Sequence, residues 1–269
     1  MKLGSDPALH TDASLPIGVF DSGVGGLSIL KALRAELPHE NFVYLADTGH
    51  APYGERGDAY VVERTRASVQ RLRDDHGVKA LVIACNTATA AAIHLLRGEH
   101  AGLPMIGVEP ALKPAAALSK TRRIGVIATR GTLASAKFRA LHDAISGQAQ
   151  FVLQACDGLA DAIENGERDR IAALCIEYTR ELGAFGQQAG QVDTLVLGCT
   201  HYAFAQSELA ALTGPGVRLV ETGIPVARQT RRLLQAAGQL NTNGSAQVRL
   251  LSTGALPALE GAAQRWLGL

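Results

Sequence analysis

The apolar and polar residues of the chain follow two alternating patterns. Short apolar runs, typical of buried parallel strands, alternate with longer segments in which leucine and alanine recur at helical spacing. The predicted strands are Ile17–Phe20, Phe42–Leu45, Ala80–Ala84, Pro104–Val108, Ile124–Ala128, Phe151–Leu153, Thr194–Leu197, Val217–Val220 and Val248–Leu251. The predicted helices are Leu27–Leu37, Ala59–His76, Ala88–Arg97, Ala111–Ser119, Leu133–Ile145, Asp157–Asn165, Arg168–Phe185, Pro225–Ala237 and a last one ending near Trp266. This alternation predicts an α/β fold with mostly parallel sheets flanked by helices.

The pattern contains an internal repeat. The strand Ile17–Asp21 matches Ile124–Ala128, and Cys85 matches Cys199 at nearly the same separation along the chain. Nearly equal separations indicate a duplicated unit. We therefore predict two pseudo-symmetric lobes, each presenting one cysteine, with an active site in the cleft between them.

Composition and charge exclude several classes of protein. The chain has 269 residues, 47% of them hydrophobic, which is enough for substantial cores. With 26 basic and 25 acidic residues and no basic run, nucleic acid is not an expected partner. No apolar run approaches the ~20 residues of a membrane span, so no membrane association is expected. Residues 1–16 lack the apolar core of a secretory signal and are predicted to be a disordered extension, which favours a cytoplasmic protein.

Four cysteines occur in the chain, at Cys85, Cys156, Cys175 and Cys199. None forms a CxxC pair or lies at zinc-finger spacing from a histidine, so we predict free thiols and no metal. We interpret Cys156 and Cys175 as small buried apolar residues. The glycine-rich stretch Gly23–Gly26 lacks the dinucleotide and P-loop signatures, and we interpret it as a tight turn beside a small ligand.

Cys85 and Cys199 each follow a predicted strand and precede polar residues. Ligands of parallel α/β sheets bind beyond the carboxyl ends of strands, and a following helix would lower the pKa of a thiol there. Two opposed thiols could invert a carbon stereocentre without a cofactor, because one removes a proton while the other supplies one. The same pair could also be a nucleophile with a helper or a redox couple, and spacing alone does not choose.

Polar residues near the two cysteines suit a small carboxylate ligand. Asp21 and His201 could each orient or help to deprotonate a neighbouring thiol. Hydroxyl and amide groups that could bind a carboxylate are provided by Ser22, Asn86, Thr87, Thr129, Thr132 and Thr200. The same residue types also cap helices at such positions, and the two roles are compatible.

Four stretches in the same order resemble the glutamate racemases of the aspartate/glutamate racemase superfamily. They are Phe20–Leu27, Pro52–Gly54, Ala84–Ala88 and Leu197–Tyr202, within a similarity that runs from about Ile17 to Val226. The resemblance implies a cofactor-independent interconversion of L- and D-glutamate by two bases, which supplies D-glutamate for peptidoglycan. It also implies a homodimer, since members of the family are often dimers.

The resemblance assigns roles by position. It implies that Cys85 takes the α-proton from D-glutamate with help from Asp21, and that Cys199 takes it from L-glutamate with help from His201. The implied substrate-binding residues are Ser22, Tyr53, Gly54, Asn86, Thr87, Thr129, Thr132 and Thr200. It further implies a first lobe of residues 17–109 and 220–269 and a second lobe of residues 110–219. Glu164 is similar to an acidic residue of the family, but we interpret it as a helix-surface residue.

The chain departs from the family pattern at three places. Ala203 and Asp157 each stand where the family has proline, and Glu221-Thr222 stands where it has an Asp-Ser pair. We expect these changes to affect the substrate loops and lobe closure rather than the reaction. Two alternatives stay open: a cysteine-dependent decarboxylase or cis–trans isomerase of the same superfamily, and a two-lobed amino-acid-binding module in which the thiols are bystanders.

Overall fold

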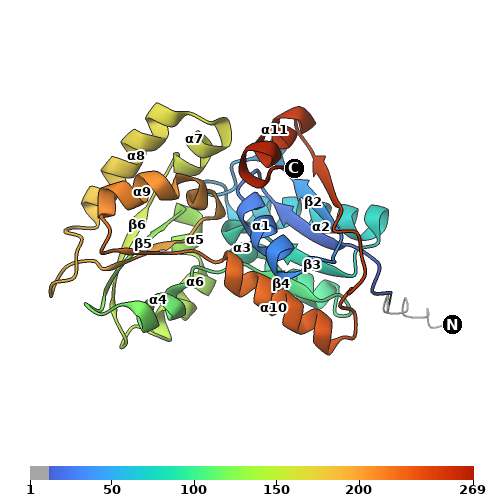
Figure 1. Cartoon of the computed structure of the whole chain (residues 1–269), viewed down its shortest axis with the longest axis horizontal. Helices are drawn as coiled ribbons and strands as arrows, with labels where there is room; N and C mark the ends of the chain where they lie inside the picture. The colour runs from blue at the N-terminus through green and yellow to red at the C-terminus, as the bar shows by residue number, and fades with distance from the viewer. Residues whose placement is uncertain (1–11) are drawn as a thin grey trace.

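Two parallel β-sheets form the framework of the protein. The computed structural model describes residues 12–269. The first sheet has the order β4-β3-β1-β2-β9 and the second the order β6-β5-β7-β8, and every pairing is parallel. The strands are β1 (Ile17–Asp21), β2 (Phe42–Ala46), β3 (Ala80–Ile83), β4 (Met105–Gly107), β5 (Arg123–Ala128), β6 (Gln150–Ala155), β7 (Thr194–Leu197), β8 (Arg218–Val220) and β9 (Val248–Ser252). The predicted α/β fold with two lobes is confirmed (Figure 1).

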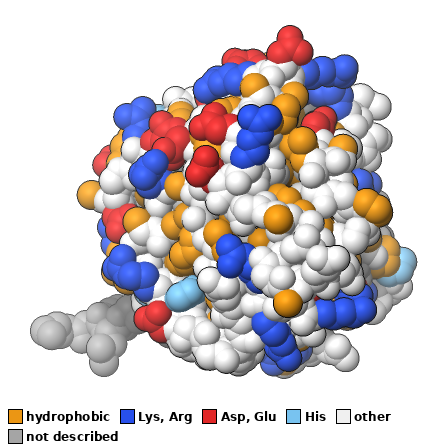
Figure 2. Space-filling model, turned by 90° about the vertical axis from the view of Figure 1, so that its left-hand side faces the viewer, with side chains coloured by type: hydrophobic (Ala, Val, Ile, Leu, Met, Phe, Trp, Pro, Cys, Tyr) orange, Lys and Arg blue, Asp and Glu red, His pale blue; other side chains and the backbone are white. Residues whose placement is uncertain are grey.

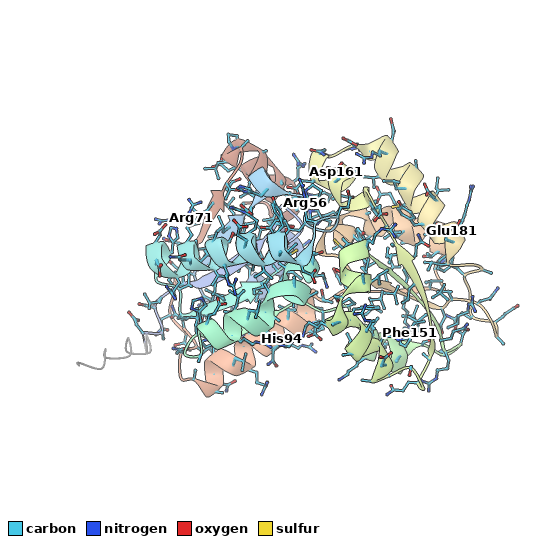
Figure 3. All side chains as sticks on the ribbon, turned by 180° about the vertical axis from the view of Figure 1, so that it is seen from behind. Arg56, Arg71, His94, Phe151, Asp161 and Glu181 are labelled. Atoms are coloured by element: carbon cyan, nitrogen blue, oxygen red, sulfur yellow. The ribbon has the colours of Figure 1, made fainter. Side chains whose placement is uncertain are left out.

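Helices cover both faces of each sheet. Around the first sheet lie α1 (Leu27–Glu36), α2 (Asp58–His76), α3 (Asn86–Glu99), α10 (Gly223–Ala236) and α11 (Leu256–Leu267). Around the second lie α4 (Leu112–Leu118), α5 (Arg130–Ala134), α6 (Ala136–Asp143), α7 (Leu159–Asn165), α8 (Arg168–Glu181) and α9 (Gln206–Thr213). Seen from behind, Arg71 on α2 lies toward the outer side of the first lobe and Glu181 on α8 toward that of the second (Figure 3).

The two sheets share one strand order. β1 lies between β3 and β2 in the first sheet, and β5 lies between β7 and β6 in the second. β3, which precedes Cys85, therefore corresponds to β7, which precedes Cys199. β9 is the addition that distinguishes the first sheet, and it returns the C-terminal part of the chain to that lobe. The lobe boundaries near residues 110 and 220 remain a prediction.

The apolar strands are buried on both faces. In β3, Ala80 and Val82 enter one core, while Leu81 and Ile83 enter the core on the opposite face. Successive side chains of a strand point to opposite faces, so a strand covered by helices on both sides must be apolar throughout. This requirement explains the continuous apolar runs of the sequence.

Two of the predicted helices differ from those in the structure. The single helix expected at Leu133–Ile145 is wrong: α5 ends at Ala134, and α6 begins after Ser135, whose Oγ accepts the N–H of Phe138 as an N-cap. The helix predicted to reach Phe185 ends at Glu181, and Gly183 follows with a positive φ of 90°.

A helical segment after the second cysteine was not predicted. The 3-10 helix η2 (Thr200–Ala205) leads directly into α9, whose N-cap is Ala205 and forms no side-chain capping bond. Without a capping residue or a break, the sequence gives no start signal there. One further 3-10 turn, η1 (Thr48–His50), lies in the predicted loop after β2.

The charge on the surface and the polarity of the helices are those expected from the composition of the chain. Acidic and basic side chains are intermixed on the outer face of the second lobe (Figure 2). Within residues 12–269, no helix has both the length and the apolar character needed to span a bilayer.

A buried ion pair fixes the base of the first lobe. Lys79 Nζ lies 2.6 Å from Glu40 Oε2, and both side chains are fully buried. Lys79 Nζ also donates to the carbonyls of Ala13 (2.6 Å) and Gln239 (2.9 Å). Lys79, just before β3, thus ties together Glu40 in the loop after α1, the segment before β1 and the segment after α10. Residues 1–11 of the predicted extension lie outside the described residues.

Removing one partner of this pair should destabilise the protein strongly. We expect Lys79→Ala to lower the free energy of unfolding by about 3–5 kcal/mol, because Glu40 is left as an uncompensated buried charge. Denaturant unfolding measures the loss. The double variant Lys79→Met/Glu40→Leu should recover most of it, and Arg66→Ala, which breaks an exposed pair with Glu99, should have a far smaller effect. A loss for Lys79→Ala as small as that for Arg66→Ala would contradict this account.

Candidate active site

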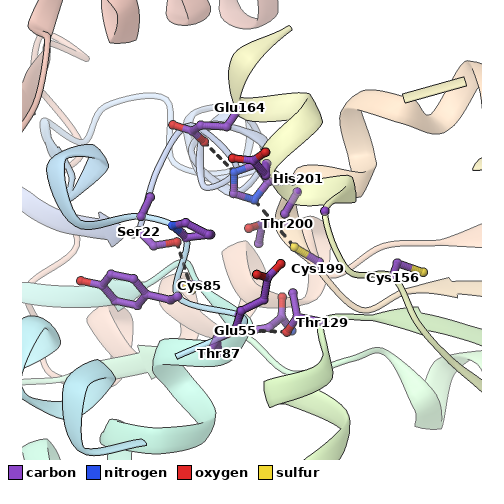
Figure 4. A pocket seen from close by; sticks show the side chains of 18 of the residues that line it. Ser22, Glu55, Cys85, Thr87, Thr129, Cys156, Glu164, Cys199, Thr200 and His201 are labelled. Atoms are coloured by element: carbon purple, nitrogen blue, oxygen red, sulfur yellow. Dashed lines mark hydrogen bonds and ion pairs between the residues drawn. The ribbon is translucent and has the colours of Figure 1, made fainter. Parts of the chain in front are cut away.

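A cavity lies where the carboxyl ends of the two sheets meet. Its volume is about 150 Å³, which is the size of an engineered protein cavity that binds benzene. Residues after β1, β2 and β3 line it from the first lobe, and residues after β5, β6 and β7 line it from the second. The predicted site residues that line it are Ser22, Tyr53, Gly54, Cys85, Asn86, Thr87, Thr129, Cys199, Thr200 and His201 (Figure 4). Asp21 and Thr132 lie behind this wall.

Cys85 is held at the start of α3. Its Sγ accepts the N–H of Ala88 at 3.4 Å and lies 3.6 Å from Ser22 Oγ. The expectation that the pKa of Cys85 would be lowered overall is wrong, although the helix N–H of Ala88 acts in that direction. Burial, reinforced by the negative charge of Asp21, raises the pKa of Cys85 to about 12, against the weaker effects of Ala88 and Ser22. The resting side chain is therefore a thiol.

Cys199 has a different environment. It precedes the 3-10 helix η2 rather than an α-helix, and its Sγ lies 3.7 Å from Nδ1 of His201. Nε2 of His201 lies 2.7 Å from Oε2 of Glu164. Thiol, imidazole and carboxylate thus form a chain, which Figure 4 shows with dashed lines. This chain can carry a proton to or from Sγ.

Glu164 is a functional candidate that the sequence interpretation missed. Its side chain is 19% exposed, lines the cavity, and accepts the N–H of Val24 from the first lobe at 2.8 Å and 3.2 Å. Its interpretation as a helix-surface residue is therefore wrong. Burial disfavours the imidazolium of His201, but Cys199 and Glu164 outweigh burial and raise the pKa of His201 well above its ordinary value.

Asp21 is buried behind the glycine turn. Its Oδ2 accepts the N–H groups of Gly23 and Gly26, each at 3.0 Å, and Oδ1 has no partner among residues 12–269. Burial raises the pKa of Asp21 to about 6, against the positive charge of His201 and the two N–H groups. In this part of the chain Asp21 makes no hydrogen bond to Cys85. It acts on that thiol through its charge.

Tyr53 lines the cavity, but its hydroxyl is already engaged. It donates to Oδ2 of Asp47 at 2.5 Å. Asp47 also accepts two hydrogen bonds from Arg64, at 3.1 Å each, and contacts His50 Nδ1 at 2.9 Å. These bonds fix the loop between η1 and α2, so Tyr53 shapes the cavity wall. Sequence reasoning missed Asp47 and Arg64, because neither belongs to a recognisable motif.

Hydroxyl groups join the two lobes on the other side of the cavity. Oγ1 of Thr87 on α3 lies 3.1 Å from Oγ1 of Thr129, which donates to Thr132 Oγ1 at 2.9 Å. Nearby, the carbonyl of Gly54 accepts the N–H of Gly131 at 3.1 Å. Thr132, which was predicted to bind the ligand, does not line this cavity and instead orients Thr129.

Asn86 carries unused hydrogen-bonding groups. It is 4% exposed and lines the cavity, and neither its Oδ1 nor its Nδ2 has a partner in the described part of the chain. A buried amide without partners is costly, since it has lost its hydrogen bonds to water. A polar ligand in the cavity would restore them.

The charges of the cavity wall are mostly negative. Its lining includes the carboxylates of Glu55, Asp157, Asp161 and Glu164, and His201 is the one basic side chain among the described lining residues. A carboxylate ligand must therefore be held by hydroxyls, amides and the backbone N–H groups at the start of α3. Asp157 forms an ion pair with Arg130.

The two remaining cysteines differ in position. Cys175 is fully buried in the core of the second lobe, as predicted. Cys156 is buried as well, but it also lines the cavity beside Cys199. Burial raises the pKa of its thiol, with a further contribution from the neighbouring Cys199. Cys156 lacks an imidazole or carboxylate partner among residues 12–269, so it has no proton relay of its own.

Comparisons with known proteins agree with this geometry. The family model of the Asp/Glu/Hydantoin racemases matches residues 27–251. The chain is 49% identical over 240 residues to a glutamate racemase of Methylococcus capsulatus, covering 87% of this chain and 85% of the relative. It is 46% identical to a glutamate racemase of Ralstonia pickettii, covering 97% and 90%.

Solved structures of glutamate racemases also resemble this chain. The glutamate racemase isoform RacE1 of Bacillus anthracis superposes with a TM-score of 0.83 at 33% identity, covering 95% of this chain and 94% of that one. The Escherichia coli glutamate racemase, solved with L-glutamate and an activator, gives a TM-score of 0.80 at 31% identity, covering 94% and 95%. Fold, paired thiols and sequence similarity together show that the chain belongs to the Asp/Glu/Hydantoin racemase family and, within it, to the glutamate racemases, which are isomerases.

Proposed function

We propose that the protein interconverts L- and D-glutamate by transferring protons between the substrate and two cysteines, without a cofactor. The observation that carries the proposal is the position of Cys85 and Cys199, which follow equivalent strands of the two sheets and line one cavity. Each is nearly buried, at 6% and 7% exposure, so water is largely excluded from both thiols. The similarity to glutamate racemases supports glutamate as the substrate.

The reaction requires the two thiols in opposite protonation states. In one direction Cys85, as thiolate, accepts the α-proton of D-glutamate, and the thiol of Cys199 donates a proton to the other face of the same carbon. In the other direction Cys199 accepts the proton from L-glutamate and Cys85 donates. Each turnover breaks one C–H bond and forms one, and moves a proton from one sulfur to the other. Exchange with solvent then restores the starting state.

The residues beside each thiol support different halves of this cycle. His201 can return a proton to Cys199 through Nδ1, while Glu164 stabilises the imidazolium at Nε2. On the other side Asp21 has a pKa of about 6, so its charge can change near neutral pH and shift the proton affinity of Cys85. We assign Asp21, and His201 together with Glu164, the role of adjusting the protonation of the neighbouring thiol. None of these three residues takes the α-proton from the substrate itself.

The remaining polar groups of the wall would hold the substrate. The amide of Asn86 has free groups for carboxylate oxygens, and the hydroxyls of Ser22, Thr87, Thr129 and Thr200 line the same cavity and would turn toward the ligand. The acidic side chains on the same wall would favour the ammonium group. The backbone around Gly54 contributes to the wall, while Tyr53 and Thr132 keep supporting roles.

The family resemblance extends the proposal to the cell. We propose that the protein supplies D-glutamate for peptidoglycan synthesis, cell-wall biogenesis and cell shape, that it acts in the cytoplasm, and that it forms a homodimer. Size-exclusion chromatography with light scattering tests the last point.

A direct test uses glutamate in deuterated water. We expect the purified protein, incubated with L-glutamate, to form D-glutamate and to incorporate deuterium at the α-carbon, because the donating thiol exchanges with solvent. Chiral chromatography with mass spectrometry measures both. Release of carbon dioxide would favour the decarboxylase alternative, and binding without any turnover would favour the amino-acid-binding module.

Substitution of either cysteine should abolish the reaction. We expect Cys85→Ala and Cys199→Ala each to lower turnover by at least about 10²–10⁴-fold in both directions, because each direction needs one thiol as base and the other as acid. Initial rates with L- and D-glutamate measure the loss. Cys175→Ala is the matched control, since that thiol is buried away from the cavity, and it should retain turnover. Near-parental rates for Cys199→Ala would refute the mechanism.

Replacing Asp21 should raise the stability of the protein near neutral pH and lower its turnover. Folding raises its pKa from the ordinary 3.8 to about 6, so the folded state is stabilised below pH ~4 and loses this advantage as the pH rises through about 6. We expect Asp21→Asn, which carries no charge, to be more stable than the parent at pH ~7.5 by on the order of 2–3 kcal/mol and no more stable near pH ~4. Urea unfolding at both values measures this difference. Turnover should fall; equal stability at pH ~7.5 would contradict the raised pKa.

A further inference from the structure

The glycine turn between β1 and α1 contacts the proton relay of the opposite lobe. Its middle residue, Val24, donates its backbone N–H to both carboxylate oxygens of Glu164. The glycines on either side face the same pair of side chains. A Cβ atom on Gly23 would lie 2.3 Å from Oε2 of Glu164, and one on Gly25 would lie 2.3 Å from Nδ1 of His201. Both distances are below the 3.0 Å that real Cβ atoms respect, so a side chain at either position would force Glu164 or His201 to move.

The backbone conformation does not require these glycines. Neither Gly23 nor Gly25 has a positive φ, in contrast to Gly77 or Gly158. An L-residue could therefore adopt the same turn without strain. The interpretation of this stretch as a tight turn beside a ligand is incomplete, because the space that a side chain would fill is occupied by Glu164 and His201.

A second contact fixes the turn against the second lobe. The hydroxyl of Ser28, on the first turn of α1, donates to the carbonyl of Gly25 at 2.8 Å and lies 3.0 Å from the carbonyl of Thr200 as a second acceptor. Thr200 directly precedes His201 in η2. The backbones on both sides of the imidazole are thus held by one hydroxyl.

From these contacts we propose that Gly23, Val24 and Gly25 form a steric socket that positions His201 and Glu164 at Cys199, so that the relay of the second lobe is complete only while the first lobe is closed on it. The proposal deepens the proposed racemase function and rests on it for its link to turnover. The three residues are positioning residues, since they act through His201 and Glu164.

The socket couples closure of the cleft to proton transfer. The nearly buried thiols require the lobes to separate before a substrate can enter. Separation withdraws the N–H of Val24 from Glu164 and the surface of Gly25 from the imidazole. Closure restores both, so the relay is assembled after the substrate is enclosed and water is excluded.

The two glycines should differ in importance. The imidazole of His201 is short and buried, so it cannot yield to a methyl group on Gly25 without leaving Cys199. The carboxylate of Glu164 ends a flexible, partly exposed side chain and can rotate away from a methyl group on Gly23. We therefore expect Gly25→Ala to disturb the relay more than Gly23→Ala.

The test follows the protonation of His201 by NMR titration of the substrate-free protein, with its signals assigned by comparison with His201→Asn. The titratable groups around this imidazole are Glu164, Cys199 and Asp21. In the parent, the imidazolium should persist well above the ordinary histidine pKa of about 6.5. In Gly25→Ala it should titrate closer to that value, and turnover should fall by about 100-fold or more. Gly23→Ala should show the same change to a smaller extent.

Two matched glycine variants serve as controls. In Gly18→Ala the new Cβ would lie 2.8 Å from Leu81 Cδ2 in the first-lobe core, so it should lower the Tm without moving the titration of His201. In Gly98→Ala the new Cβ meets no atom within 4 Å, so this change in α3 should not lower the Tm and should leave the titration of His201 unchanged. A folded Gly25→Ala or Gly23→Ala protein with the parental titration would overturn the socket. A shifted titration in a protein whose parent never racemises glutamate would overturn the proposed function and leave the socket standing.

Discussion

The parallel direction of all strands within each sheet is the constraint on which the site depends. Because the strands run the same way, their polar end residues collect along one edge of the sheet. Two sheets with the same strand order then present equivalent edges, and these edges line one cavity of about 150 Å³. Cys85 and Cys199 lie at corresponding positions for this reason. The pairing of the thiols is a property of topology, which the local sequence around either cysteine does not contain.

Equivalent positions do not give equivalent thiols. Cys85 caps a regular α-helix beside Ser22, and burial together with Asp21 keeps it protonated. Cys199 precedes a 3-10 helix, where the imidazole of His201 takes the place of the capping bond. One thiol is thus tuned by a buried charge and the other by a hydrogen-bonded relay. A reaction that uses both faces of one carbon accommodates this asymmetry, since each direction uses both groups.

Much of the site is built by residues that a ligand would never touch. Asp47 and Arg64 hold the hydroxyl of Tyr53 and with it the wall of the cavity. Thr132 orients Thr129, and the glycine turn supports the relay of the opposite lobe. These supports tie the two lobes and the loops together, so the positions of the reactive groups depend on the closed arrangement as a whole.

The sequence by itself determined the strands, most helices and the two cysteines that line the cavity, because strand burial on both faces and thiols at strand ends leave local patterns. It also gave no signal for the break at Ser135 inside a helical pattern or for the uncapped α9. Tertiary structure alone decided the surroundings of Glu164, which lies 37 residues from His201, meets it where α7 packs on η2, and accepts the N–H of Val24 from the other lobe. It also reversed the expected pKa of Cys85, because the free energy of desolvating a thiolate depends on burial by distant segments, and burial outweighs the local helix N-terminus.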